Sequence, residues 1–168
     1  TAALSRRDGP TCLMLSRQNI AFATREHDQV AAIARGGYVL RDFAGTAGAQ
    51  RAVVIATGSE VPLALAAREA LAAEGIDVRV VSMPCTSLFD RQDAAYRANV
   101  LPRGIARTAV EAGVTAGWRK YVGAEDDPRA AVVGIDRFGE SAPAGVLFKH
   151  FGFTAAHVAD AIRGTLAQ

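Results

Sequence analysis

The sequence predicts an α/β fold, a three-layer α/β/α domain on a mainly parallel sheet of about five strands, with one antiparallel edge strand. Two observations predict this class. Short apolar runs rich in β-branched residues recur along the chain, and most of them lead into a segment of helical character. Such alternation is typical of a parallel sheet covered on both faces and connected by right-handed crossovers.

The expected strands fall into two kinds. A continuous apolar run of β-branched type indicates a buried strand at 52–56, and further strands are expected at 78–82, 106–111 and 130–135. Apolar and polar residues alternate at 38–43, which indicates a half-exposed or edge strand. Helices are expected at 61–73, 88–92, 94–99, 117–121, 144–151 and 154–166.

Caps support two of these helices. Ser59 is predicted to be the N-cap of the helix at 61–73, and Pro62 fits its first turn. For the helix at 154–166, Thr154 or Asp160 is expected to assist capping.

The first 35 residues are interpreted separately. A polar, helix-capable stretch at 23–34 ends at Gly36 and Gly37, since glycine commonly terminates helices. We interpret 21–35 as a linker and expect the main domain at 36–168. Ahead of the linker, Thr11–Leu15 is long enough for a buried parallel strand. Because it comes so early in the chain, the rest of its sheet must come from elsewhere.

Composition restricts the classes of function. The chain has 168 residues, of which 50% are apolar, and a formal charge of +2 from 19 basic and 17 acidic residues. These charges are mixed along the chain, so nucleic-acid binding is not expected. Cys12 and Cys85 are too isolated for a disulfide framework or a thiolate metal site. With no signal-peptide core and no apolar run of membrane-spanning length, we expect a cytoplasmic protein with no membrane partner.

Arg17 is the candidate binding residue. It follows the predicted strand Thr11–Leu15, and ligands of open α/β sheets bind beyond the carboxyl ends of such strands. A guanidinium offers a rigid fork of donors to a phosphate or carboxylate, and Ser16, Gln18 and Asn19 could orient it. From the residues alone, a structural role for Arg17 stays open.

Other polar groups fit structural roles better. The turn Thr57–Glu60 could hold an anion at a helix start, but it lacks nucleotide-binding fingerprints and is interpreted as a capped turn. Three carboxylates are expected near the carboxyl edge of the sheet: Glu111, Asp136 and Glu140, with Arg137 nearby. A hydrolase would need two of them close together, so ion pairing at a domain or subunit contact is the favoured role. The histidines show no metal-ligand spacing; they are His27, His150 and His157.

Seven segments, taken in order, resemble transketolase. They are Gly-Pro-Thr-x-Leu-x-Leu-Ser-Arg-Gln-Asn from Gly9, Gly-Gly-Tyr-Val-Leu from Gly36, Ile-Ala-Thr-Gly-Ser-Glu-Val from Ile55, Val-Arg-Val-Val-Ser-Met-Pro from Val78, Val-Glu-Ala-Gly from Val110, Lys-Tyr-Val-Gly from Lys120 and Phe-Gly-Glu-Ser-Ala-Pro-Ala from Phe138. The resemblance covers essentially the whole chain, but only the last part of a transketolase subunit.

The resemblance implies a division of the chain and an activity for its parent protein. Residues 1–20 would be the last helix end and strand of the pyrimidine-binding domain, 21–35 the linker, and 36–168 the C-terminal domain. The parent would be a homodimer of the pentose phosphate pathway. It would transfer a two-carbon ketol unit from a ketose phosphate to an aldose phosphate, with thiamine diphosphate and a divalent cation, Mg or Ca, held by other domains.

For this chain alone, the resemblance implies one site residue and no catalysis. Arg17 matches the arginine of Ser-Arg-Gln-Asn, which binds the sugar phosphate in that family. The chain lacks the family's cofactor and metal motifs, so it should bind neither cofactor nor metal and should be inactive by itself. Thr11–Leu15, without its own sheet, should be disordered, repacked or paired with another copy. Since the chain does not begin with Met, we expect a processed or cut end.

Two alternatives remain open at this point. Deoxyxylulose phosphate synthase and the beta subunit of 2-oxo acid dehydrogenases share this domain, although the Ser-Arg-Gln-Asn and Phe-Gly-Glu-Ser-Ala-Pro segments favour transketolase. The chain could also be a stand-alone dimerisation or regulatory module that is not catalytic.

Overall fold

The computed structural model describes residues 2–167 and contains one five-stranded sheet. Its strands, in chain order, are β1 (Tyr38–Arg41), β2 (Gln50–Ala56), β3 (Ile76–Ser82), β4 (Ala106–Val110) and β5 (Ala130–Val133). In space they lie in the order β1-β3-β2-β4-β5. β1 pairs with β3 in antiparallel register, and the other pairs are parallel. The prediction of a mainly parallel sheet with an antiparallel edge strand is confirmed.

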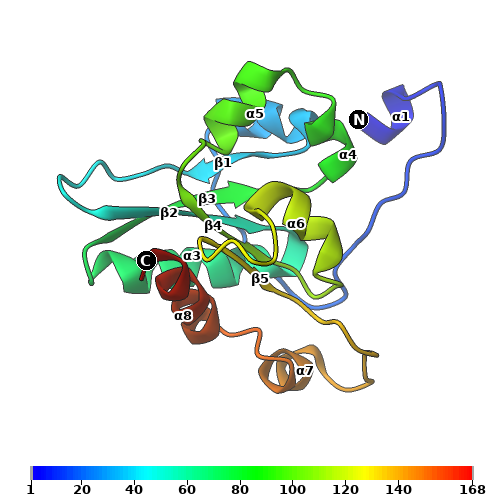
Figure 1. Ribbon diagram of the computed structural model, residues 1–168. Coiled ribbons are helices and arrows are strands. Elements are labelled where there is room, and N and C mark those ends of the chain that lie inside the picture. The colour runs from blue at the N-terminus through cyan, green and yellow to red at the C-terminus, as the bar shows by residue number, and fades with distance from the viewer. Residues whose placement is uncertain (1, 168) are drawn as a thin grey trace.

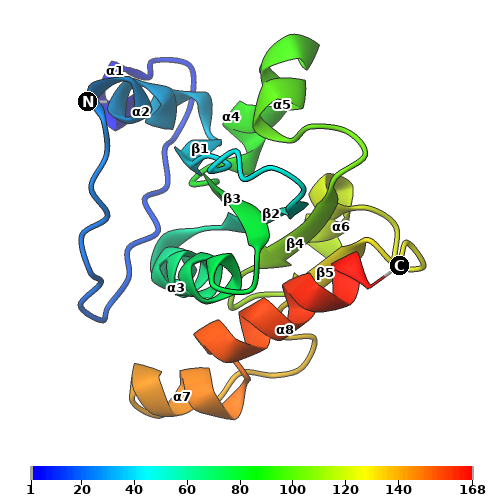
Figure 2. The same cartoon turned by 90° about the vertical axis from the view of Figure 1, so that its left-hand side faces the viewer.

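Helices cover both faces of this sheet (Figures 1 and 2). One face carries α3 (Val61–Ala72) and α8 (Ala155–Leu166); the other carries α4 (Thr86–Asp90), α5 (Ala94–Val100) and α6 (Ala116–Val122). The remaining helices are α1 (Ala2–Ser5), α2 (His27–Ala32), α7 (Ala144–His150) and the 3-10 turns η1 (Ile33–Arg35) and η2 (Gly58–Glu60). This arrangement is the predicted three-layer α/β/α fold.

The hydrophobic core consists of two clusters, one on each face of the sheet. Successive residues of β2 point to opposite faces, so Val54 packs with Leu71 and Ile162 beneath α3 and α8, whereas Val53 and Ile55 pack against the other helical layer. The continuous apolar sequence of β2 is therefore explained by burial on both sides. The C-terminal helix is fixed by the predicted cap, because the Thr154 hydroxyl accepts a hydrogen bond from the backbone N–H of His157 at 3.2 Å.

Thr11–Leu15, predicted as a strand of a sheet that lies outside this chain, is not paired here. These residues form no strand, and their apolar side chains are exposed, by 94% for Met14. A strand needs a neighbour that accepts and donates its backbone hydrogen bonds, and the strands of this chain's own sheet are paired with one another instead. The segment is therefore an exposed, irregular stretch in this chain.

The structure corrects two local predictions, the extent of the helix at 23–34 and the N-cap of α3. The helix expected at 23–34 is shorter, because the capping box of Glu26 and Gln29 starts α2 only at His27, and η1 follows to the left-handed Gly36. Ser59 is not the N-cap of α3. The backbone makes the turn η2 first, which puts Glu60 at the N-cap position, and the Ser59 hydroxyl bonds to the Glu60 carboxylate instead.

Candidate functional site

Glu60 ties together the turns that follow β2 and β4 at the carboxyl edge of the sheet. Its side chain is only 3% exposed. The Ser59 hydroxyl donates to it at 3.1 Å, and the backbone N–H of Ala112 donates to it at 3.4 Å. This turn closes the end of the central strand, where a parallel sheet presents its ligand-binding edge.

The environment of Glu60 favours its neutral form. Burial raises the pKa of Glu60, and the nearby Glu111 charge acts in the same direction, while the hydrogen bonds from Ser59 and Ala112 oppose the shift. Glu111 itself accepts a hydrogen bond from the indole N–H of Trp118 on α6. The hydrogen bonds of Glu60 and Glu111 therefore stabilise the turns at this edge of the sheet.

The two acidic residues after β5 hydrogen-bond to different partners: Asp136 to Thr115 and Glu140 to His150. Asp136 accepts from the Thr115 backbone N–H at 2.9 Å and from its hydroxyl at 2.7 Å, and these bonds lower the pKa of Asp136. In the following loop, Nε2 of His150 lies 2.8 Å from the Arg137 guanidinium and 3.2 Å from the Glu140 carboxylate. The carboxylates named in the sequence thus hold different partners, which matches polar linkage rather than a converging hydrolase pair.

The N-terminal segment that carries Arg17 crosses the carboxyl edge of the sheet (Figure 1). Ser16 approaches the turn after β2, with its hydroxyl oxygen 3.9 Å from the position that a Cβ would take on Gly58. Arg17 follows at a bend and is exposed. The structure therefore places the segment next to the turn after β2, with Ser16 at the approach and Arg17 exposed beside it.

A cavity of about 350 Å³ lies between this segment and the main domain, and no motif in the sequence predicts it. Residues 20–23 form one wall, and Tyr38, Gly58 and Pro62 contribute to the other. Arg25 also lines the cavity and joins its two walls by donating to the Tyr38 hydroxyl at 2.6 Å and to the carbonyl of Ala23 at 2.7 Å. Residues from both sides of the linker thus form a single lining.

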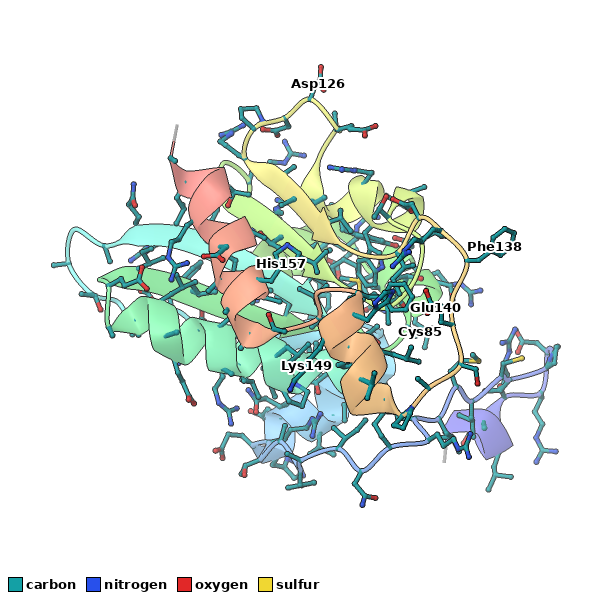
Figure 3. All side chains as sticks on the ribbon, turned by 90° about the horizontal axis from the view of Figure 1, so that it is seen from below. Cys85, Asp126, Phe138, Glu140, Lys149 and His157 are labelled. Carbon is teal, nitrogen blue, oxygen red and sulfur yellow. The ribbon has the colours of Figure 1, made fainter. Side chains whose placement is uncertain are left out.

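The loop after β5 exposes a large apolar side chain. Phe138 is 96% exposed and points away from the loop that also carries Glu140 (Figure 3). Across residues 2–167 there is no group of three or more His, Cys, Asp or Glu side chains that could hold a metal ion. No helix within that range is long and apolar enough to cross a membrane.

Together these features define an α/β domain that receives, across the carboxyl edge of its sheet, a preceding segment with an exposed arginine. Residues 36–154 match the model of the transketolase-like TK C-terminal domain. The chain belongs to this family.

Individual proteins agree with this assignment. The chain is 57% identical over 156 residues to transketolase 1 of Escherichia coli K12, a match that covers 92% of this chain and 22% of that protein. A transketolase structure from Leishmania mexicana has a TM-score of 0.70 at 44% identity and covers 82% of this chain and 19% of the other. A transketolase complex with sedoheptulose-7-phosphate from Pichia stipitis gives 0.71 at 37%, with the same coverages. These relatives favour transketolase over the related thiamine enzymes.

Proposed function

We propose that this chain is the C-terminal portion of a transketolase subunit. Residues 1–20 end the pyrimidine-binding domain, 21–35 are the linker, and 36–168 form the C-terminal domain. The chain spans 22% of the length of the Escherichia coli relative, which supports this division. The parent enzyme is a cytoplasmic homodimer that moves a two-carbon ketol unit from a ketose phosphate to an aldose phosphate in the pentose phosphate pathway.

The role proposed for this chain in the reaction is to supply Arg17 to the substrate. The carrying observation is its position, because the segment lies at the carboxyl edge of the sheet and leaves the guanidinium exposed. A guanidinium binds a phosphate through two parallel hydrogen bonds and cannot lose its charge at physiological pH. The Pichia stipitis relative, described as a complex with a sugar phosphate, supports this ligand.

Thiamine diphosphate and its divalent cation, Mg or Ca, belong in this proposal to the rest of the subunit. The described residues 2–167 offer no cluster of metal-binding side chains, so the donor set of this chain does not fit the metal. What the chain contributes is substrate binding and the surface against which the preceding domains pack.

Replacing Arg17 with Ala in the full-length enzyme tests the proposal. A charged hydrogen bond contributes about 1.5–3 kcal/mol, so kcat/KM for a phosphorylated ketose should fall by roughly 10- to 100-fold. Arg17→Lys should restore activity only in part, because an ammonium lacks the guanidinium fork. Arg7→Ala, a change at another exposed arginine ahead of the linker, is the matched control.

The choice of substrate separates phosphate binding from a structural role. An unphosphorylated ketose offers Arg17 nothing to bind, so its kcat/KM should be nearly the same in the wild type and in Arg17→Ala. Equal losses for both substrates would show that Arg17 is not a phosphate ligand.

A further inference from the structure

A second cavity, also of about 350 Å³, lies among α4, α5, α6 and the segment that leads into β4. The helices that line it, α4, α5 and α6, lie on the sheet face opposite α3 and α8 (Figure 1). Four cationic side chains line it, together with one carboxylate, Asp90. The cations are Arg97, Arg103, Arg107 and Lys120. Such an excess of positive charge in one concavity favours an anionic ligand.

One of these cations is already neutralised. Lys120 donates to the Asp90 carboxylate at 2.8 Å, and the Tyr121 hydroxyl donates to the other oxygen of the same group at 3.0 Å. These bonds lower the pKa of Asp90, which therefore stays ionised and remains paired with Lys120. The positive charge that this pair leaves uncompensated comes from the arginines.

Two of these arginines, Arg97 and Arg107, bond to carbonyl groups rather than to carboxylates. Arg97 donates to the backbone carbonyl of Asp90 at 3.1 Å. Arg107 donates to the carbonyl of Tyr121 at 2.8 Å and to that of Leu101 at 3.0 Å. Within residues 2–167, no ion pair involves Arg97, Arg103 or Arg107. Carbonyl groups fix the direction of a guanidinium but leave its charge without a counter-charge.

Arg107 shows the effect of this imbalance most clearly. Its side chain is partly buried at the start of β4, and burial lowers the pKa of its guanidinium. An arginine nevertheless stays protonated in proteins, so its charge persists in a less polar environment. A bound anion would supply the missing counter-charge, and the carbonyl bonds already hold the guanidinium in one orientation.

We propose that this pocket binds a phosphate monoester, with the phosphoryl group held by Arg97, Arg103 and Arg107. The organic part of the ligand lies against the apolar wall, which is formed by Phe89, Leu101 and the ring of Tyr121. A cavity of this size accommodates a small organic molecule. The pocket lies near the start of β4, whereas the segment that carries Arg17 crosses the carboxyl ends of the parallel strands (Figure 1). The two arginine sites can therefore be tested separately.

Calorimetric titration of the 168-residue chain with inorganic phosphate and with phenyl phosphate tests this site. The ionic strength is held constant, because screening alone changes the binding of anions. Saturable binding of both probes is expected. Phenyl phosphate should bind more tightly, because its ring contacts the apolar wall. Absence of saturation with phenyl phosphate at millimolar concentration would overturn the proposal, and equal affinity for the two probes would overturn the assignment of a monoester.

Substitutions locate the binding. Arg97→Gln and Arg103→Gln remove exposed cations, so both variants should remain folded, and each should weaken phenyl phosphate binding about 10-fold or more. Arg7→Gln changes the net charge equally and should leave the affinity unchanged. A loss with Arg17→Gln, and none with Arg97→Gln or Arg103→Gln, would place the ligand on the N-terminal segment and refute the pocket.

Discussion

Replacing Gly36 with Ala should sharply destabilise the domain. Gly36 ends η1 with φ +82°, a conformation that costs a residue with a side chain roughly 1–2 kcal/mol. In addition, a Cβ at this position would overlap the carbonyl oxygen of Cys85 and would lie 2.5 Å from the backbone nitrogen of Phe89. Overpacking of this kind typically costs about 1–3 kcal/mol. The free energy of unfolding should therefore fall by about 2–5 kcal/mol in total.

Gly75 provides a matched control. It has nearly the same conformation, φ +76°, but open space where a Cβ would go. Urea unfolding of Gly75→Ala should show only the cost of conformation, so the difference between the two variants measures the close approach of α4 to Gly36. Equal losses of stability in both variants would refute the steric argument. Such a result would mean that the backbone at Cys85 moves away at little cost.

Two further predictions concern the carboxyl edge and the cofactor. Because the pKa of folded Glu60 is raised above its ordinary 4.5, the folded state binds more protons than the unfolded chain, and this contribution to stability is lost as pH rises through the raised pKa. The stability of Glu60→Gln relative to the wild type should therefore increase with pH above 4.5 in urea unfolding, and a constant difference would contradict this. The 168-residue chain with its basic pocket disabled by Arg97→Gln and Arg103→Gln should give no saturable heat with thiamine diphosphate and Mg²⁺, whereas the full-length enzyme with the same two substitutions should; a 1:1 complex of the substituted chain would contradict the proposed division.

The sheet could be predicted because continuous apolar runs have few other ways to become buried. The runs at 52–56 and 78–82 lie within β2 and β3, at the centre of the sheet, and the alternating segment at 38–43 contains the edge strand β1. Thr11–Leu15 is a different case, because its expected sheet lies outside this chain and the segment forms no strand here. Its composition suits a strand, but strand formation also depends on a neighbour, which the local pattern does not reveal.

The polar sites were less predictable, because their members come from distant parts of the chain. The turn Thr57–Glu60 was recognisable, yet the burial of Glu60 depends on Ala112, which lies 52 residues further on. The basic pocket combines Arg97, Arg107 and Lys120 from three separate elements, so no local cluster of charge marks it. For Arg17, the sequence supplied the residue and its chemistry, while the approach of the neighbouring Ser16 to the turn after β2 is a tertiary feature.

Gly36 is also the first of residues 3–167 to be buried. Residues 3–35 contribute partly covered or exposed side chains, while the buried residues of both core clusters follow Gly36. Residues 36–167 therefore contain the buried core that stabilises the domain, whereas residues 3–35 bury little surface against it. Selection on the two parts should therefore differ. Substitutions in residues 36–167 are limited by packing within the domain. Substitutions in residues 3–35 are limited by the surface that this segment contacts.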